Sequence, residues 1–230
     1  YIWREGKPGG KLPNDWDSLF EGKAWQYDEA ARRYYLHLFA VRQPDLNMDN
    51  PRVREEVKAV MRFWLELGVD GFREDVITFI SKAEGLPNDP LVPAAKGLRH
   101  YNSGPHVHEY LQEFRRDALD GYDCVTIGEA PMMTPKRALT FIAGERPDLD
   151  LMFNIQHMQA DCWFIEYFPR PFSLRRLKRA SSRWQSAMRG RAWHTLYLEN
   201  HDHPRVISRY GSEKSRVLSG KALACAYLFQ

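Results

Sequence analysis

The sequence predicts an α/β fold in which short parallel strands alternate with helices. Four apolar segments indicate strands, near residues 69–75, 124–129, 149–156 and 193–200, and segments with helical periodicity separate them. Strands joined through helices imply right-handed parallel crossovers. Four such strands would make half of a (β/α)8 barrel, but the alternation also suits an open doubly wound sheet. No G-x-G-x-x-G or Walker loop follows any strand, and periodicity alone leaves the two architectures unresolved.

The first 50 residues differ in composition from the rest. They are rich in Gly, Pro, Asn, Asp and aromatic residues, and only RYYLHLF (33–39) favours a strand. A clear helix begins after Asn50, which can cap it, with Pro51 at its first position and Gly68 at its end. Further helices are expected at 106–123, at 134–144 after Thr134, and at 173–190 after Ser173.

Composition bounds the class of protein. The formal charge is +3 and basic residues are interspersed with acids, so we expect neither a nucleic-acid nor a membrane partner. Three cysteines without a CxxC pair predict neither a disulfide framework nor a zinc site, which favours a cytoplasmic location. The chain starts without Met and stops within a helical pattern at SGKALACAYLFQ, so we expect a fragment of a longer protein.

Carboxylates follow three of the predicted strands. Asp75, Glu129 and Asp202 lie where the carboxyl ends of parallel strands would bring them to one mouth, and such a set suits glycoside hydrolysis. Any one of them alone is more often a helix cap or an ion-pair partner. His201 and His203 flank Asp202, but neighbours on an extended strand point to opposite faces, so no metal site is predicted. The residues themselves predict an α/β enzyme that uses carboxylates.

Three motifs carry a family resemblance. DGFREDV (70–76), TIGEA (126–130) and YLENHDHPRVISRYG (197–211) resemble, in order and spacing, signature regions of the α-amylase superfamily, glycoside hydrolase family 13. The stretch AWQYDEAARRYYLHLFAVRQPDLNMDNPRVREEV further resembles its oligo-1,6-glucosidase and α-glucosidase branch. The resemblance implies a (β/α)8 TIM barrel, of which residues 51–230 would hold strands 4 to 7. Residues 1–50 would be part of an inserted subdomain, domain B-like.

The resemblance also implies roles for the motif residues. Asp75 matches the nucleophile, and Arg73 would hold its carboxylate ionised and oriented on the same strand face. Glu129 matches the general acid/base. Asp202 matches the third carboxylate, which binds sugar hydroxyls more tightly in the transition state, and His201 matches a neighbouring hydroxyl donor.

Residues around these motifs bear on the substrate. Phe20, Phe39 and Gln43 fall where the branch places substrate contacts on its inserted subdomain. Val76, directly after the nucleophile, resembles enzymes that act on α-1,6 bonds, whereas threonine there accompanies α-1,4 specialists. Glu74 replaces the usual apolar residue and, alternating away from Asp75, should face the helix layer or solvent.

The resemblance therefore predicts a retaining α-glucosidase that hydrolyses terminal α-1,6 bonds, and also α-1,4 bonds, of small oligosaccharides through a covalent glucosyl-enzyme intermediate. It needs no cofactor, and the calcium loop that many relatives carry would precede residue 1. We expect residues 1–230 alone to be inactive. One alternative is a sucrose isomerase or transglucosidase of the same branch, in which an acid stands at the position of Lys178 in RLKR. Another is a non-catalytic binding or transporter-associated ectodomain, but such relatives have lost the carboxylates that this chain keeps.

Overall fold

The structure, a computed structural model, describes residues 1–90, 95–163 and 168–228. Its contacts divide the chain into two compact units, Tyr1–Gly71 with Ile77–Cys124 and Phe72–Val76 with Val125–Gln230. This division does not separate residues 1–50 from the rest of the first unit, so the inserted subdomain remains a prediction. Within the described ranges, no helix combines the length and apolar character that crossing a bilayer requires.

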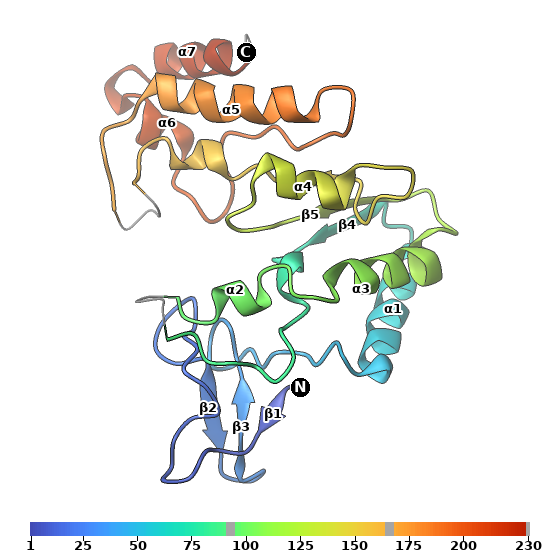
Figure 1. Cartoon of the computed structure of the whole chain (residues 1–230). Helices are drawn as coiled ribbons and strands as arrows, with labels where there is room; N and C mark the ends of the chain where they lie inside the picture. The colour runs from blue at the N-terminus through green and yellow to red at the C-terminus, as the bar shows by residue number, and fades with distance from the viewer. Residues whose placement is uncertain (91–94, 164–167, 229–230) are drawn as a thin grey trace. The chain divides into compact units, whose positions relative to one another are not determined.

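An antiparallel sheet opens the first unit. Its order is β1-β3-β2, with β1 at Trp3–Arg4, β3 at Arg33–Leu36 and β2 at Trp25–Asp28 (Figure 1). The expected strand at 33–39 is confirmed for its first four residues, which form the centre of this sheet. Sequence analysis missed β1 and β2, because segments of two and four residues are too short to show alternation.

Helices form the rest of the first unit. Asn50 caps α1 through its side chain, which accepts from the Arg52 N–H at 3.0 Å, and Pro51 takes the first position as predicted. The helix expected at 106–123 is shorter, and its second part winds as a π-helix. The elements are α1 (Pro51–Glu66), η1 (Ile77–Phe79), α2 (Leu98–Tyr101), α3 (Val107–Phe114) and the π-helical η2 (Arg115–Leu119).

A buried lysine joins α1 to α3 and η2. The Lys58 side chain is only 3% exposed, and its Nζ lies 2.9 Å from Glu113 and 3.0 Å from Asp117. Burial alone would lower the pKa of Lys58, but hydrogen bonds to Glu55, Glu113 and Asp117 outweigh it and raise this pKa. Hydrogen bonds from Arg116 and Lys58 lower the pKa of Asp117 to about 2. The ion network therefore fixes the packing of these helices.

A parallel sheet organises the second unit. Its strands are β4 (Gly71–Glu74), β5 (Val125–Gly128) and β6 (Leu151–Met152), in that order. Beyond β6, Phe153 forms a parallel bridge with Thr195. Sheet order thus follows chain order, so successive crossovers advance in one direction. A barrel is built in this way, whereas a doubly wound sheet reverses direction at its centre.

The strands are shorter than the sequence predicts. The segment expected as a strand at 149–156 forms a ladder only over Leu151–Met152, and the one expected at 193–200 forms no strand. The latter meets the sheet at the single bridge of Thr195, and its Trp193 side chain is 80% exposed. Apolar composition indicated a strand there, but a strand also needs a continuous ladder of backbone partners. The fourth strand is therefore a wrong prediction.

Helices pack beside the sheet of the second unit. The helices predicted after Thr134 and Ser173 are confirmed, and both side chains cap as expected. α5 packs against α4 and α7 (Figure 1). Its Leu177 lies in a buried cluster with Tyr210 and Leu223. The elements are α4 (Pro135–Ile142), η3 (Gln156–Gln159), α5 (Leu174–Met188), α6 (Val206–Tyr210), η4 (Glu213–Ser215) and α7 (Arg216–Leu228).

Replacing Lys58 tests the ion network. We expect Lys58→Met to lower the free energy of unfolding by about 1–3 kcal/mol at pH 7, because it leaves partly buried carboxylates without their cation. The stability linked to the low pKa of Asp117 is present above about pH 4 and is lost as pH falls toward 2, so the difference should shrink over that range. Urea unfolding at each pH, monitored by hydrogen exchange of the α1 amides, measures this difference in free energy. Arg52→Met, on an exposed position of the same helix, should leave stability nearly unchanged.

Candidate active site

The ends of neighbouring strands bring two of the predicted acids together. Asp75 directly follows β4, and Glu129 directly follows β5. The backbone N–H of Glu129 donates to the carbonyl oxygen of Glu74 at 2.9 Å, which joins the two strand ends. This backbone bond places the two side chains at the same edge of the sheet.

One guanidinium lies between the two carboxylates. Arg73 Nη1 donates to Asp75 Oδ1, and its Nη2 donates to Glu129 Oε2 at 2.5 Å. The sequence predicted a contact of Arg73 with Asp75 alone, and the contact with Glu129 is a finding of the structure. A planar guanidinium holds both its partners in fixed directions, and Arg73 therefore sets the relative position of the acids.

The two carboxyls differ in their surroundings. The side chain of Glu129 is 13% exposed, whereas that of Asp75 is 71% exposed. Burial raises the pKa of Glu129, the charge of Arg73 opposes this, and a hydrogen bond and the charge of Asp75 add to the rise, so the net pKa is raised. A raised pKa is the direction that a general acid requires, because it favours the protonated form.

Asp202, the third predicted acid, contributes to the pKa of the same guanidinium, that of Arg73. Burial lowers the pKa of Arg73, but its bond to Asp75 and the charges of Glu129, Asp75 and Asp202 raise it. Asp202 therefore lies within electrostatic range of the pair. Its backbone N–H donates to Asn200 Oδ1 at 3.1 Å, and its Oδ1 lies 3.5 Å from His201 Nε2. Both side chains are exposed, so each is accessible to a ligand.

The backbone turns sharply at Val76. Its φ is +42°, in the left-handed region that β-branched residues rarely adopt, at a cost of about 1–3 kcal/mol. The turn lets the Val76 N–H bond to the Glu129 carboxyl, a contact that lowers the pKa of Glu129 and so partly offsets the rise. Sequence analysis predicted a role for the Val76 side chain but had no signal for this backbone role.

Glu74 is buried, so the solvent-facing option expected for it is wrong. The remaining predicted contacts, Phe20, Phe39 and Gln43, lie in the first unit. There the rings of Phe20 and Phe39 meet edge to face at 5.6 Å, and Gln43 Oε1 accepts from the Ala40 N–H at 3.2 Å. Their role as substrate contacts remains a prediction.

His157 is a site-supporting residue that sequence analysis missed. It is fully buried, its Nε2 donates to the Tyr197 carbonyl oxygen at 2.7 Å, and its ring meets that of Tyr197 edge to face. Burial lowers the pKa of His157 to about 4, so the ring is neutral at pH 7. The contact holds the segment that leads to His201 and Asp202. A lone histidine in sequence gives no signal of this role.

In the part of the chain that the structure describes, no three His, Cys, Asp or Glu side chains form a group that could hold an ion. His201 and His203, on either side of Asp202, form no such group either.

Comparison with known proteins identifies the domain type. Residues 1–230 match the model of the alpha amylase catalytic domain. The chain is 48% identical over 233 residues to the oligo-1,6-glucosidase of Parageobacillus thermoglucosidasius and covers 41% of it, with 97% of this chain aligned. It is 45% identical to the alpha-glucosidase of Pediococcus pentosaceus, over 100% of this chain and 42% of that protein. The chain thus spans about two-fifths of the length of these curated relatives.

A solved structure is also similar to this chain. The crystal structure of Bacillus licheniformis trehalose-6-phosphate hydrolase matches with a TM-score of 0.92 and 41% identity, over 99% of this chain and 41% of that one. Identity and structural agreement at this level describe a common fold and a common ancestry.

Because folding raises the pKa of Glu129, ionisation of this carboxyl should lower the stability of the protein. Because folding raises this pKa, ionised Glu129 destabilises the fold above the pKa of the unfolded carboxyl, about 4.3. Glu129→Gln, which mimics the protonated form, should therefore raise the free energy of unfolding at pH 7 by about 0.5–2 kcal/mol, and the gain should vanish below about pH 4. Thermal unfolding across this pH range measures it.

Glu199 is the matched control for that experiment. The Val206 N–H and Arg205 lower its pKa, so Glu199→Gln should shift stability at pH 7 in the opposite direction. A loss of stability in Glu129→Gln at neutral pH would contradict the assignment of Glu129 as the buried proton holder.

Proposed function

The chain belongs to the alpha amylase catalytic-domain family of glycoside hydrolases, which have the (β/α)8 barrel fold, and we propose that the whole protein is a retaining α-glucosidase. Its substrates are short oligosaccharides, and the bonds cleaved are terminal α-1,6 and also α-1,4 glucosidic bonds. In this proposal the chain contributes the part of the barrel that holds β4, β5 and β6.

The contact of Asp75 and Glu129 through Arg73 carries the proposal. Retaining enzymes place their two carboxyl groups about 5–5.5 Å apart, whereas inverting enzymes separate them by about 6.5–9.5 Å to admit a water molecule. Here the two carboxyls bind the two Nη atoms of one guanidinium, which holds them close together. This arrangement supports retention of configuration.

The residues then act in two steps. The Asp75 carboxylate attacks the anomeric carbon while the glycosidic C–O bond breaks and Glu129 gives its proton to the leaving oxygen. Glu129, now ionised, takes a proton from water, the water oxygen attacks the anomeric carbon, and the bond to Asp75 breaks. The products are glucose and the shortened sugar, with both carboxyls restored to their first protonation states.

The other site residues bind rather than react. Asp202 accepts hydrogen bonds from sugar hydroxyls, and its carboxylate charge suits the positive character that develops at the sugar ring. His201, beside it, donates to a hydroxyl. Arg73 donates to Asp75 and prevents the nucleophile from rotating away from the anomeric carbon.

Two observations support the preference for α-1,6 bonds. Several curated relatives are named oligo-1,6-glucosidases, with identities of 45–48% for the first three. Val76 presents an apolar, branched wall directly after the nucleophile. Trehalose-6-phosphate hydrolase and trehalulose synthase are also among the similar proteins, so the whole protein must be tested on several sugars.

A product and stereochemistry assay tests the reaction. The whole protein, incubated with isomaltose, should release α-glucose first, as followed by proton NMR of the anomeric signals before mutarotation. Asp75→Asn should lower kcat by about 10⁴-fold or more, because it removes the nucleophile but keeps the shape of the side chain. A fluorinated glucosyl fluoride should leave a glucosyl ester on Asp75, which mass spectrometry of peptides detects.

Other outcomes of this assay would replace the proposal. Initial release of β-glucose would mean an inverting enzyme. Conversion of sucrose to an isomer would favour the transglucosidase alternative despite Lys178. Sugar binding that survives Asp75→Asn, without turnover of isomaltose, maltose or sucrose, would favour a non-catalytic relative.

Linkage preference has its own test. Val76→Thr keeps the branched shape at the strained position but adds a hydroxyl, and we expect the ratio of kcat/KM for isomaltose to that for maltose to fall about tenfold. Steady-state kinetics with both sugars measures the ratio. Val69→Thr, which makes the same chemical change at a residue before β4, is the control and should leave the ratio unchanged. An unchanged ratio in Val76→Thr would remove Val76 from the determinants of linkage.

A further inference from the structure

A cavity in the second unit is lined by four arginines. Its volume is about 210 Å³, and the segment after β6 and the first half of α5 form its walls. The lining includes Trp163, Arg170, Arg176, Arg179 and Arg183. Cavities that hold drug-sized ligands measure about 300–1,000 Å³, so this one suits a small anion or a single sugar ring.

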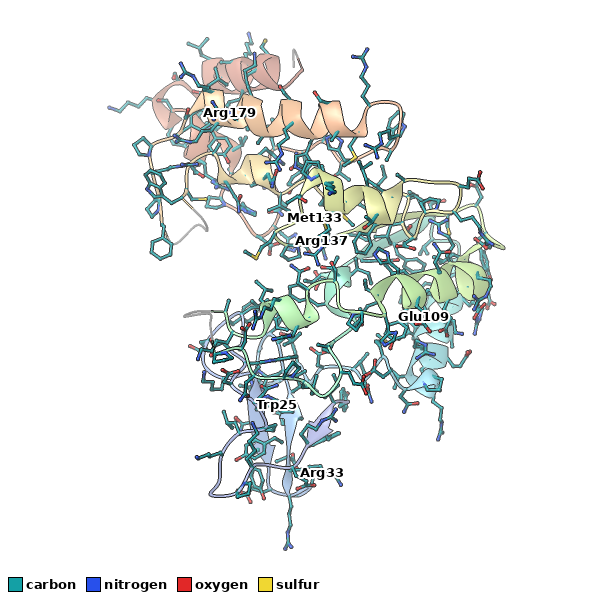
Figure 2. The ribbon with its side chains drawn as sticks, viewed as in Figure 1. Trp25, Arg33, Glu109, Met133, Arg137 and Arg179 are labelled. Carbon is teal, nitrogen blue, oxygen red and sulfur yellow. The ribbon has the colours of Figure 1, made fainter. Side chains whose placement is uncertain are left out.

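Three of these arginines form one stripe on α5. Arg176, Arg179 and Arg183 are spaced by three and four residues, so their side chains leave the same side of the helix (Arg179 is labelled in Figure 2). The opposite side is buried through Leu177 and Trp184. Like charges at this spacing repel and destabilise a helix, and an anion between them would remove that repulsion.

The fourth arginine comes from the loop opposite. Arg170 stacks on Trp163 with its guanidinium carbon 4.9 Å from the ring centre, and Trp163 is 63% exposed. The Nε of Arg170 is buried and has no hydrogen-bond partner among the described residues. A buried donor left without a partner costs free energy, and a ligand acceptor in the cavity would satisfy it.

The cavity also offers donors without competing acids. In the described parts of the chain, no carboxylate lines it. Two of its arginines donate to backbone carbonyl oxygens, Arg176 through Nε to Ala160 at 2.9 Å and Arg170 through Nη2 to Gln159 at 3.4 Å. Asp161, which is near in sequence, is held instead by Arg209 at 2.6 Å. Gln156 uses its Oε1 to accept from Trp184 at 2.9 Å, which leaves its amide nitrogen as a further donor.

From this arrangement we propose that the cavity is a binding site for a phosphate dianion, either free or as the phosphate monoester of a sugar. Arg179, Arg183 and the buried Nε of Arg170 supply charge-assisted hydrogen bonds to the phosphate oxygens, and the exposed ring of Trp163 provides a face for an attached sugar. The site is distinct from the carboxylates after β4 and β5, and the proposal does not depend on the proposed hydrolysis.

Binding measured without turnover tests the site. The whole protein is titrated by calorimetry with inorganic phosphate, glucose 6-phosphate and glucose, at constant ionic strength set with chloride. Both phosphates should bind and glucose should not. Arg179→Gln should weaken phosphate binding roughly tenfold or more, because it removes a charged donor from an exposed position that folding does not need. Lys178→Gln removes the same charge from the same helix outside the cavity and should not weaken it.

The outcomes distinguish free phosphate from a sugar phosphate as the ligand. Equal affinities for the two phosphates identify the free ion as the ligand. Tighter binding of glucose 6-phosphate, lost in Trp163→Ala, identifies the sugar ester. Absence of phosphate binding, binding of glucose as tightly as its phosphate, or equal losses in Arg179→Gln and Lys178→Gln would overturn the proposal. A protein that binds phosphate but hydrolyses no sugar would keep this site and reject the proposed function.

Discussion

The contact of Arg73 with Asp75 and Glu129 is the constraint on which the candidate site depends. One guanidinium fixes two acids that come from different strands, one of them buried and the other exposed. The two acids also differ in burial, and burial raises the pKa of Glu129, which is the direction that the proposed role of a general acid needs. Charge and position are therefore set by the same side chain.

The parallel sheet makes this contact possible. β4 and β5 are neighbours, and the backbone bond from Glu129 to Glu74 ends their ladder at the residues where the functional side chains begin. The left-handed turn at Val76 then leads the chain away from the sheet and directs an N–H toward Glu129. A strained valine persists here because the contacts around it fix the backbone, as is common at functional sites.

Local signals in the sequence predicted much of this structure, and long-range partners explain the remainder. The Asn50 and Thr134 caps and the acids after two strands follow from short motifs, and the structure confirms their positions. The strand expected at 193–200 failed because apolar residues do not reveal whether a ladder partner exists. The Arg73–Glu129 contact, the buried His157 and the arginine cavity join residues far apart in sequence, so spacing could not show them.

The order of the parallel strands also has a consequence for how the protein folds during synthesis. Val125 follows Glu74 by 51 positions, so β4 leaves the ribosome well before its partner β5 exists. Contacts between distant segments form slowly, because the intervening chain must first lose conformational entropy. During that interval Arg73 and Asp75 have each other but lack Glu129, and the nascent edge of β4 is exposed to pairing with other chains. The contact between Arg73 and Glu129 therefore forms only after β5 has been synthesised, and until then the edge of β4 has to be protected from other chains.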